Sequence, residues 1–231
     1  LRKDERVVFK GAGSLPSGLT TSNAGTLLLN SDVTQRAGTA VPGQFIWNGA
    51  GGFAAGTAAG ITVALGQTPS GATQTLQWGS SYLSANSTLV FGSEYSQGAV
   101  RFQNSIDLAS NQGNVAVYGT YLGSQGNLAP DARYTAYMSG NITNGGLNVG
   151  GAGYNGTLYL TGQNQLSSFV LNGGLVSTID DHANLGHLMQ STGGSVTIKG
   201  GTLVLGGAEK MTTVDVQAGG QIVAGAALTT G

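Results

Sequence analysis

The chain has no cysteine among its 231 residues, and charged residues make up only 8% of it. It therefore cannot hold its fold together with disulfides, and it offers no thiolate for metal binding or nucleophilic catalysis. A cytosolic enzyme of this length usually keeps one or two cysteines. We take their absence to indicate a protein outside the cytosol.

Positive charge is also scarce, because no lysine occurs between Gly11 and Ile198. The three arginines in that stretch are scattered, at Arg36, Arg101 and Arg133. A nucleic-acid partner requires a basic stripe that displaces counterions, and an anionic membrane surface requires the same. The composition excludes both partners, and no apolar run is long enough to span a membrane.

Glycine is abundant, with 41 residues, and it separates short runs that alternate between apolar and polar positions. Such runs, bounded by Gly, Asn and Ser, are typical of β-strands joined by tight turns. No long stretch keeps the spacing of an amphipathic helix. We therefore predict an all-β fold, with strands at 25–30, 44–49, 60–66, 74–79, 87–92, 99–108, 114–123, 156–162 and 168–174.

The segment 195–225 repeats itself at an interval of 18 or 19 residues. Two alternating apolar residues, a glycine pair and one further apolar residue occur twice: Val196, Ile198, Gly200, Gly201 and Leu203, then Val214, Val216, Gly219, Gly220 and Ile222. Glycine adopts positive φ without penalty, so a glycine pair lets the backbone turn sharply between two strands. A strand, a corner, a second strand and a return describe one coil of a solenoid. The pattern predicts a right-handed parallel β-helix.

The regularity of the repeat divides the chain into three parts. Residues 1–10 form a charged tail, a cap or a donated strand, and 11–140 form an irregular β-rich region with insertions. Residues 141–231 form regular coils of about 19 residues. For the N-terminal half, an antiparallel β-sandwich is the alternative, because its strands also recur every 8–12 residues.

Two segments, 156–176 and 200–223, carry a more specific pattern. The first reads GTLYLTGQNQLSSFVLNGGLV, and the second keeps its Gly-Thr-Leu and Gly-Gly elements. Both resemble the passenger-associated repeat of bacterial autotransporters. The resemblance covers roughly the last 80 residues in detail and implies a β-helical stalk. It also implies an extracellular location, on the outer surface of a Gram-negative-type cell. The motif marks architecture and not activity, because passengers of this family range from adhesins to toxins and structural fibres.

The densest internal cluster of ionisable side chains is IDDHANLGH, with Asp180, Asp181, His182 and His187. Carboxylates and imidazoles together are suitable ligands for Zn or Ni, so these four residues are the candidate metal ligands. No further ligand follows at a familiar spacing, and His-x₄-His is not the i, i+4 pair of a helix. We expect a polar loop and no metal.

Other chemistry finds little support in the residues. A G-x-G-x-x-G match ends at Gly156, but a strand follows it where a dinucleotide site requires a helix, so we expect no cofactor. No serine fits a nucleophile elbow. The best enzymatic alternative is a carbohydrate-active β-helix, whose candidate residues would be Arg101, Asp107, Asp131 and Arg133.

Aromatic residues crowd the middle third of the chain, with Trp47 and Trp78 upstream of it. The tyrosines concerned are Tyr118, Tyr121, Tyr134, Tyr137, Tyr154 and Tyr159. A row of tyrosines packed in the core or covering a sheet edge is the first interpretation. A stacked stripe that binds glycans or a partner surface is the alternative.

These observations give one leading function and two alternatives. The first is a non-enzymatic extracellular stalk or adhesive passenger that recognises a host or surface glycan or protein receptor. The second is a self-polymerising filament subunit, in which one end of the solenoid accepts a strand from the next copy. The third is the carbohydrate-active enzyme. The candidate subunit contacts are Arg6, Val7, Val8, Phe9 and Lys10 at one end and Ile222 and Val223 at the other.

Overall fold

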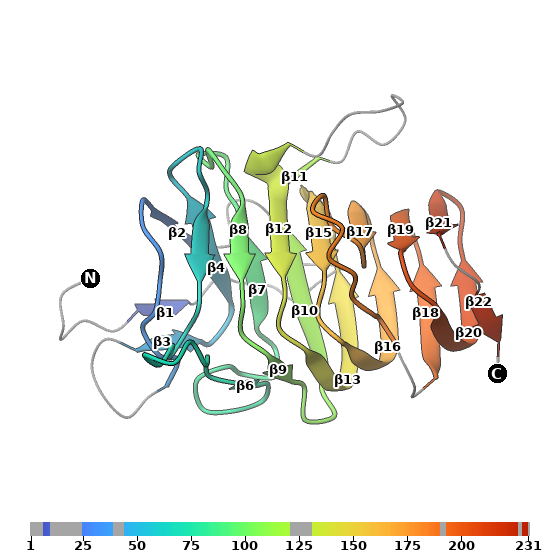
Figure 1. The fold of residues 1–231 in the computed structure, drawn as a ribbon, viewed down its shortest axis with the longest axis horizontal. Helices are drawn as coiled ribbons and strands as arrows, with labels where there is room; N and C mark the ends of the chain where they lie inside the picture. Colours follow the sequence, from blue (N-terminus) through green and yellow to red (C-terminus); the bar gives the residue numbers. More distant parts are fainter. Residues whose placement is uncertain are drawn as a thin grey trace.

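The computed structural model describes residues 7–9, 25–38, 44–120, 131–189, 193–225 and 228–230. The chain forms an elongated stack of strands, and the succession from blue to red in Figure 1 runs along its longest axis. The first and last described segments, 7–9 and 228–230, lie at opposite ends of this stack (Figure 1).

Two parallel sheets run the length of the stack and face each other across the core. The path of the larger sheet is β2 (Gly25–Leu29), β4 (Ala50–Ala55), β7 (Thr88–Phe91), β10 (Gln112–Val117), β13 (Ile142–Val149), β16 (Gln165–Leu171), β18 (Gly194–Ile198), β20 (Glu209–Val216) and β22 (Leu228–Thr230). The second sheet contains β5 (Ile61–Val63), β8 (Val100–Phe102), β12 (Thr135–Met138), β15 (Thr157–Leu160), β17 (Leu175–Ser177), β19 (Gly201–Leu205) and β21 (Gly220–Ala224). From β4 onward, the chain visits the two sheets in turn, and each coil stacks in register on the one before it. This is the arrangement of a parallel β-helix, as the sequence predicts.

The remaining elements are short. Four of them belong to the larger sheet but lie off its main path, where they attach to β10 and β13: β6 (Leu76–Gln77), β9 (Ile106–Asp107), β11 (Gly119–Thr120) and β14 (Tyr154–Asn155). A separate two-stranded sheet pairs β1 (Val7–Phe9) with β3 (Phe45–Trp47). The 3₁₀ turn η1 (Ala132–Tyr134) is the one helical element of the described residues, and none of those residues forms a helix long enough to cross a membrane.

The repeat seen in the sequence is one coil stacked on another. Val196 pairs with Val214 and Ile198 with Val216 between β18 and β20. Leu203 pairs with Ile222 between β19 and β21. The two segments that resemble the passenger-associated repeat each span one strand of the second sheet, one of the larger sheet and the start of the next coil.

The N-terminal half continues the same solenoid and is not an antiparallel sandwich. Strands β2, β4, β7 and β10 pair in parallel, as do β5, β8 and β12. Its coils vary in length, and so do those toward the C-terminus: Gly51 pairs with Leu89, whereas Phe169 pairs with Val196 and Val196 with Val214. The insertions carry extra strands and turns, and they obscure the period in the sequence without changing the pairing.

The core consists of rows of inward-facing side chains, one from each coil. Leu147, Phe169, Val196 and Val214 form one such row by successive pairing. An aromatic cluster closes the N-terminal end of the core, where Phe45, Trp47 and Phe53 lie with ring centroids 5.2–6.0 Å apart. Trp47 and Trp78 are buried, which places both tryptophans in the core.

Glycines form the corner between the two sheets. Gly174 and Gly201 occupy equivalent positions in successive coils, with φ of +85° and +84°. A Cβ atom on Gly174 would lie 2.5 Å from the carbonyl oxygen of Gly156, and one on Gly201 would contact the carbonyl oxygen of Gly174. Each corner therefore needs glycine both for its backbone conformation and for the close approach of the coil below.

Candidate functional site

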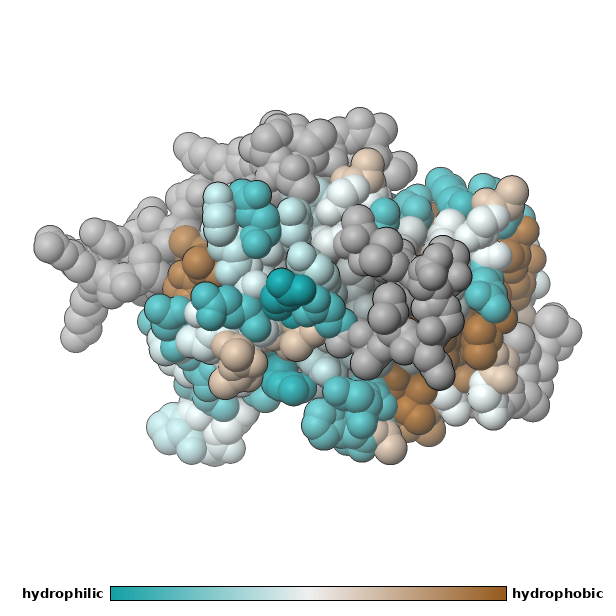
Figure 2. Space-filling view, turned by 90° about the horizontal axis from the view of Figure 1, so that it is seen from above, coloured by the Kyte–Doolittle hydropathy of each residue, from teal (hydrophilic) through white to brown (hydrophobic). Residues whose placement is uncertain are grey.

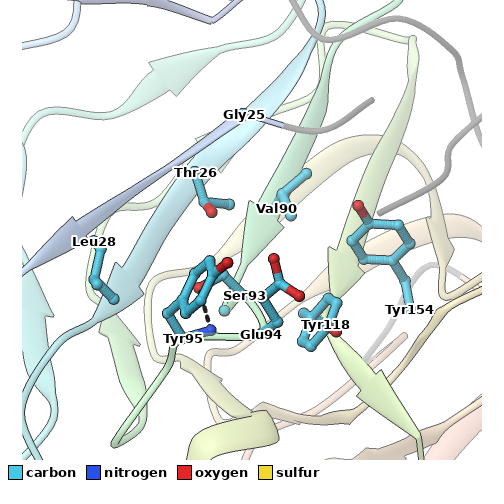
Figure 3. A pocket seen from close by; sticks show the side chains of 10 residues that line it. Gly25, Thr26, Leu28, Val90, Ser93, Glu94, Tyr95, Tyr118 and Tyr154 are labelled. Carbon is cyan, nitrogen blue, oxygen red and sulfur yellow. Dashed lines mark hydrogen bonds between the residues drawn. The ribbon is translucent and has the colours of Figure 1, made fainter. Parts of the chain in front are cut away.

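A pocket of about 460 Å³ opens on the outer face of the larger sheet, near its N-terminal end (Figure 3). Thr26 and Leu28 of β2 form one wall. The turn after β7 supplies Ser93, Glu94 and Tyr95, and Tyr118 and Tyr154 close the opposite side. We call these seven residues the tyrosine pocket.

Thr26 of β2 and Val90 of β7 line the pocket on either side of β4. Thr26 pairs with Gly52, and Gly52 pairs with Val90, so that these three residues form one row across β2, β4 and β7. A Cβ atom on Gly52 would collide with the backbone carbonyl oxygen of Val90, so only glycine fits the middle of this row.

The turn after β7 places its side chains at the rim of the tyrosine pocket. Gly92 turns the chain at φ +83°. The backbone N–H of Ser93 donates to Ser96 Oγ at 2.8 Å, and the N–H of Tyr95 donates to Ser93 Oγ at 3.2 Å, the bond drawn in Figure 3. These bonds fix the turn, and Tyr95 projects from it with 67% of its surface exposed.

The tyrosines of the pocket differ in their burial. Tyr154 is 2% exposed, and burial raises the pKa of its hydroxyl to about 12. Its ring meets Tyr118 edge to face, with centroids 6.2 Å apart. A hydrogen bond with the Glu94 carboxylate raises the pKa of Tyr95. Both hydroxyls are therefore neutral at physiological pH and able to donate a hydrogen bond.

A second pair of tyrosines lies on the outer face of the other sheet. Tyr137 and Tyr159 are paired neighbours on β12 and β15, and their rings stack at 4.9 Å. The guanidinium of Arg101 lies 4.2 Å from the centre of the Tyr137 ring. The tyrosines crowded in the sequence thus separate into two groups on two sheets, and Tyr121 lies outside the described residues.

Asp180, Asp181 and His182 come together, with potential ligand atoms within 4.8 Å of one another. Each carboxylate already has partners in the chain. Asp180 accepts from the backbone N–H groups of His182 and Asn184 at 2.9 and 2.8 Å. Partial burial raises the pKa of Asp180, but its hydrogen bonds with Asn184 and His182 more than offset this, and the net pKa is lowered. These hydrogen bonds hold residues 180–184 in a turn.

Asp181 fastens this turn to the second sheet. The Tyr137 hydroxyl lies 3.1 Å from both Asp181 carboxylate oxygens, and His182 Nδ1 lies 2.7 Å from Asp181 Oδ1. Burial and the nearby Asp181 charge raise the pKa of Tyr137 to about 12. The loop between β17 and β18 is therefore held against β12.

His187 is separate from this cluster. Its Nδ1 atom lies 3.6 Å from an oxygen of Glu209 and has no hydrogen-bond partner among the described residues. The Glu209 side chain is fully buried and accepts two backbone N–H groups, those of Leu188 and Met189, each at 2.7 Å. The sequence analysis missed Glu209. Its one trace in the sequence is its place in the second repeat copy, where it occupies the position that Asn164 has in the first.

Asn164 has a corresponding structural role. Its Oδ1 accepts the backbone N–H of Ile142 at 2.8 Å, and its Nδ2 donates to the carbonyl of His187 at 2.7 Å. The repeat therefore places an inward-pointing polar side chain at this corner, where it bonds backbone groups that the strand ladders leave unpaired.

The residues considered for a carbohydrate-active enzyme take part in separate local contacts. Asp131 forms a bidentate pair with Arg133, which lowers the pKa of Asp131. Asp107 accepts from the backbone of Ala109 and from Asn144. Arg101 lies against Tyr137. These contacts do not form a common acid–base arrangement.

A second, more polar depression of about 610 Å³ lies beside Asp107. Ala109, Ser110 and Asn144 line it with positive φ of 47°, 65° and 61°. Strained backbone of this kind is often found at functional sites. Here it forms the turn that brings the Ser110 N–H within 2.6 Å of the Asn144 carbonyl, and the lining has no aromatic side chain.

The candidate subunit contacts lie at the two ends of the stack. Val7, Val8 and Phe9 form β1 and pair with β3 of the same chain, while Arg6 and Lys10 lie outside the described residues. Ile222 and Val223 lie on β21, the terminal strand of its sheet.

The comparisons with known proteins give no relative for this chain. No family model, no curated protein and no solved structure matches it. The assignment of function therefore depends on the residues and the geometry described above.

Proposed function

We propose that the protein is a non-enzymatic, extracellular β-helical scaffold that serves as a stalk or adhesive passenger at a bacterial surface. The observation that carries the proposal is the continuous parallel stack. The same ladder runs from β2 to β22, and its polar side chains hold the coils together. A solenoid of this kind acts as a spacer and presents an extended surface for binding along its length.

The placement of the ionisable groups supports a scaffold over an enzyme. Glu209 and Asp180 bind backbone amides, Asp131 pairs with Arg133, and Asp181 fastens a loop. Glycoside hydrolysis needs two carboxylates free to face one substrate bond across a groove. Among the described residues that line the tyrosine pocket, Glu94 carries the one carboxylate, so no second carboxylate faces it there.

The extracellular location and the relationship to autotransporter passengers are proposed from the structure of the repeat. Each segment that resembles the passenger-associated repeat coincides with one coil. Its glycines sit at corners, and Asn164 bonds the coil below. These are structural reasons for the repeat to keep its pattern, and they agree with a surface passenger of the autotransporter type.

The test combines an activity assay with a binding assay on the purified chain. Incubated with plant, bacterial and animal polysaccharides, the chain is expected to release no new reducing ends or unsaturated products. It is expected to remain attached to surfaces that carry its receptor. Cleavage of any polysaccharide, abolished by the double substitution Asp107→Asn and Asp131→Asn, would establish the enzyme instead.

Self-association is a second candidate, and one observation favours it. At the C-terminal end, Val214 and Val216 are 41% and 46% exposed although their positions continue the core rows, and Val223 is 42% exposed. Figure 2 shows hydrophobic residues gathered toward that end of the molecule, at the right of the view. An exposed core row of this kind can stack on the end of a second copy.

We expect assembly, where it occurs, to depend on this end. The double substitution Val214→Lys and Val216→Lys should return the chain to monomers in size-exclusion chromatography and remove fibres from negative-stain images. Thr213→Lys and Asp215→Lys, on the same strand but outside the core row, serve as the matched control and should leave assembly intact. Equal assembly of both double variants would contradict this candidate.

A further inference from the structure

We infer that the tyrosine pocket binds a neutral sugar residue. The inference deepens the proposed adhesive function and depends on it. It starts from the chemistry of the lining, which consists of hydroxyl groups, aromatic rings and one carboxylate.

The hydrogen-bonding groups of the pocket suit a ligand with many hydroxyls. Five lining residues carry a hydroxyl: Thr26, Ser93, Tyr95, Tyr118 and Tyr154. Each hydroxyl both donates and accepts, and the Glu94 carboxylate accepts through two oxygens. A sugar ring presents the complementary array of neutral hydroxyls at short intervals.

The apolar groups of the pocket suit the other side of such a ring. Tyr95 is 67% exposed and Leu28 is 48% exposed, and both stand at the rim. An aromatic face is electron-rich, so it attracts the polarised C–H groups of a sugar ring. Figure 3 shows the Glu94 carboxylate between the Tyr95 and Tyr118 rings, where it can reach the hydroxyls of a sugar stacked on Tyr95.

Other ligand classes fit the pocket less well. An anion would meet the Glu94 charge, and none of the described residues that line the pocket is a lysine, arginine or histidine. An organic cation requires several aromatic faces directed at one point. Here Tyr118 turns its ring edge to face with Tyr154, and Tyr154 is buried. The volume of about 460 Å³ lies within the range of roughly 300–1,000 Å³ that is usual for small-molecule sites.

The binding experiment uses the full chain and methyl glycosides of neutral hexoses and their disaccharides as probes. Saturation-transfer NMR identifies the binders, and titration calorimetry gives the dissociation constants. We expect Tyr95→Ala to weaken binding at least tenfold, because the stacking face is lost. Tyr95→Phe should retain most of the affinity, and Glu94→Gln should weaken binding about three- to tenfold.

A matched control removes a carboxylate elsewhere. Asp215 is exposed on β20, far along the chain from the tyrosine pocket, and Asp215→Asn makes the same change in charge as Glu94→Gln. The Asp215→Asn variant should bind the probes with the affinity of the unmodified protein. All four variants should keep the β-sheet circular dichroism spectrum, because both substituted turn residues are exposed.

The outcomes separate this inference from the proposed function. No binding of any neutral glycoside, or binding that Tyr95→Ala leaves unchanged, overturns the sugar site but leaves the scaffold standing. A preference for sulfated or sialylated probes over neutral ones also overturns it. Turnover of a probe overturns the proposed non-enzymatic function itself.

Discussion

Replacing Glu209 with alanine is expected to lower the free energy of unfolding by about 2–6 kcal/mol. The carboxylate accepts the N–H groups of Leu188 and Met189 at 2.7 Å, and it does so inside the core. Without it, two buried donors lose their partner, and each such orphan costs about 1–3 kcal/mol. Urea unfolding followed by circular dichroism measures the change.

Glu209→Gln is the matched variant, because it keeps the volume and removes only one acceptor. The glutamine amide offers one oxygen for two N–H groups and directs its own NH₂ at the second. We expect about half the destabilisation of Glu209→Ala. Hydrogen exchange at the amides of Leu188 and Met189 should rise in both variants, and unchanged protection of these amides would contradict the assigned bonds.

The difference in stability between the unmodified protein and Glu209→Gln is expected to change with pH in a definite direction. Burial raises the pKa of Glu209 above its usual 4.5, and the backbone amides of Met189 and Leu188 and the nearby His187 offset only part of this. The folded state then holds a proton that the unfolded state releases, so stability is gained as the pH falls through the folded pKa toward 4.5. The stability advantage of the unmodified protein over Glu209→Gln should therefore grow as the pH is lowered from neutral. A difference that shrinks over this range would show that Glu209 is held as a stabilised carboxylate.

Glu209 also marks the limit of what sequence reasoning could find. The all-β class and the parallel coils followed from the short alternating runs and from the repeat at 18–19 residues. Asn164 and Glu209 share a position in two copies of that repeat, yet one is an amide and the other a carboxylate. A pattern that records residue identity does not show that both reach inward to backbone N–H groups.

The tyrosine pocket could not be predicted because its residues are distant in the chain. Thr26, Glu94 and Tyr154 come together because β2, β4, β7, β10 and β14 pair side by side in one sheet, and the irregular coil lengths of the N-terminal half hide this pairing in the sequence. The tyrosines did stand out as a crowded set in the sequence. Their separation into one group at a pocket and another against Arg101 depends on which sheet each strand joins.

Substituting the corner glycine Gly201 is the second change expected to have a large effect. Gly201→Ala should lower the free energy of unfolding by about 2–5 kcal/mol. About 1–2 kcal/mol comes from forcing a side chain into the left-handed region at φ +84°. A further 1–3 kcal/mol or so comes from overpacking, since the new Cβ would lie 2.8 Å from the backbone nitrogen of Gly174.

Gly219 is the control that separates these two contributions. It has nearly the same conformation, with φ +89°, but a Cβ there would have no atom of the described residues within 4 Å. Gly219→Ala should therefore show only the conformational part, about 1–2 kcal/mol. Urea unfolding of both variants gives the difference directly. If the two substitutions were equally destabilising, the corner glycines would serve backbone conformation alone, and the close stacking of one coil on the next would not limit which residue can turn the chain.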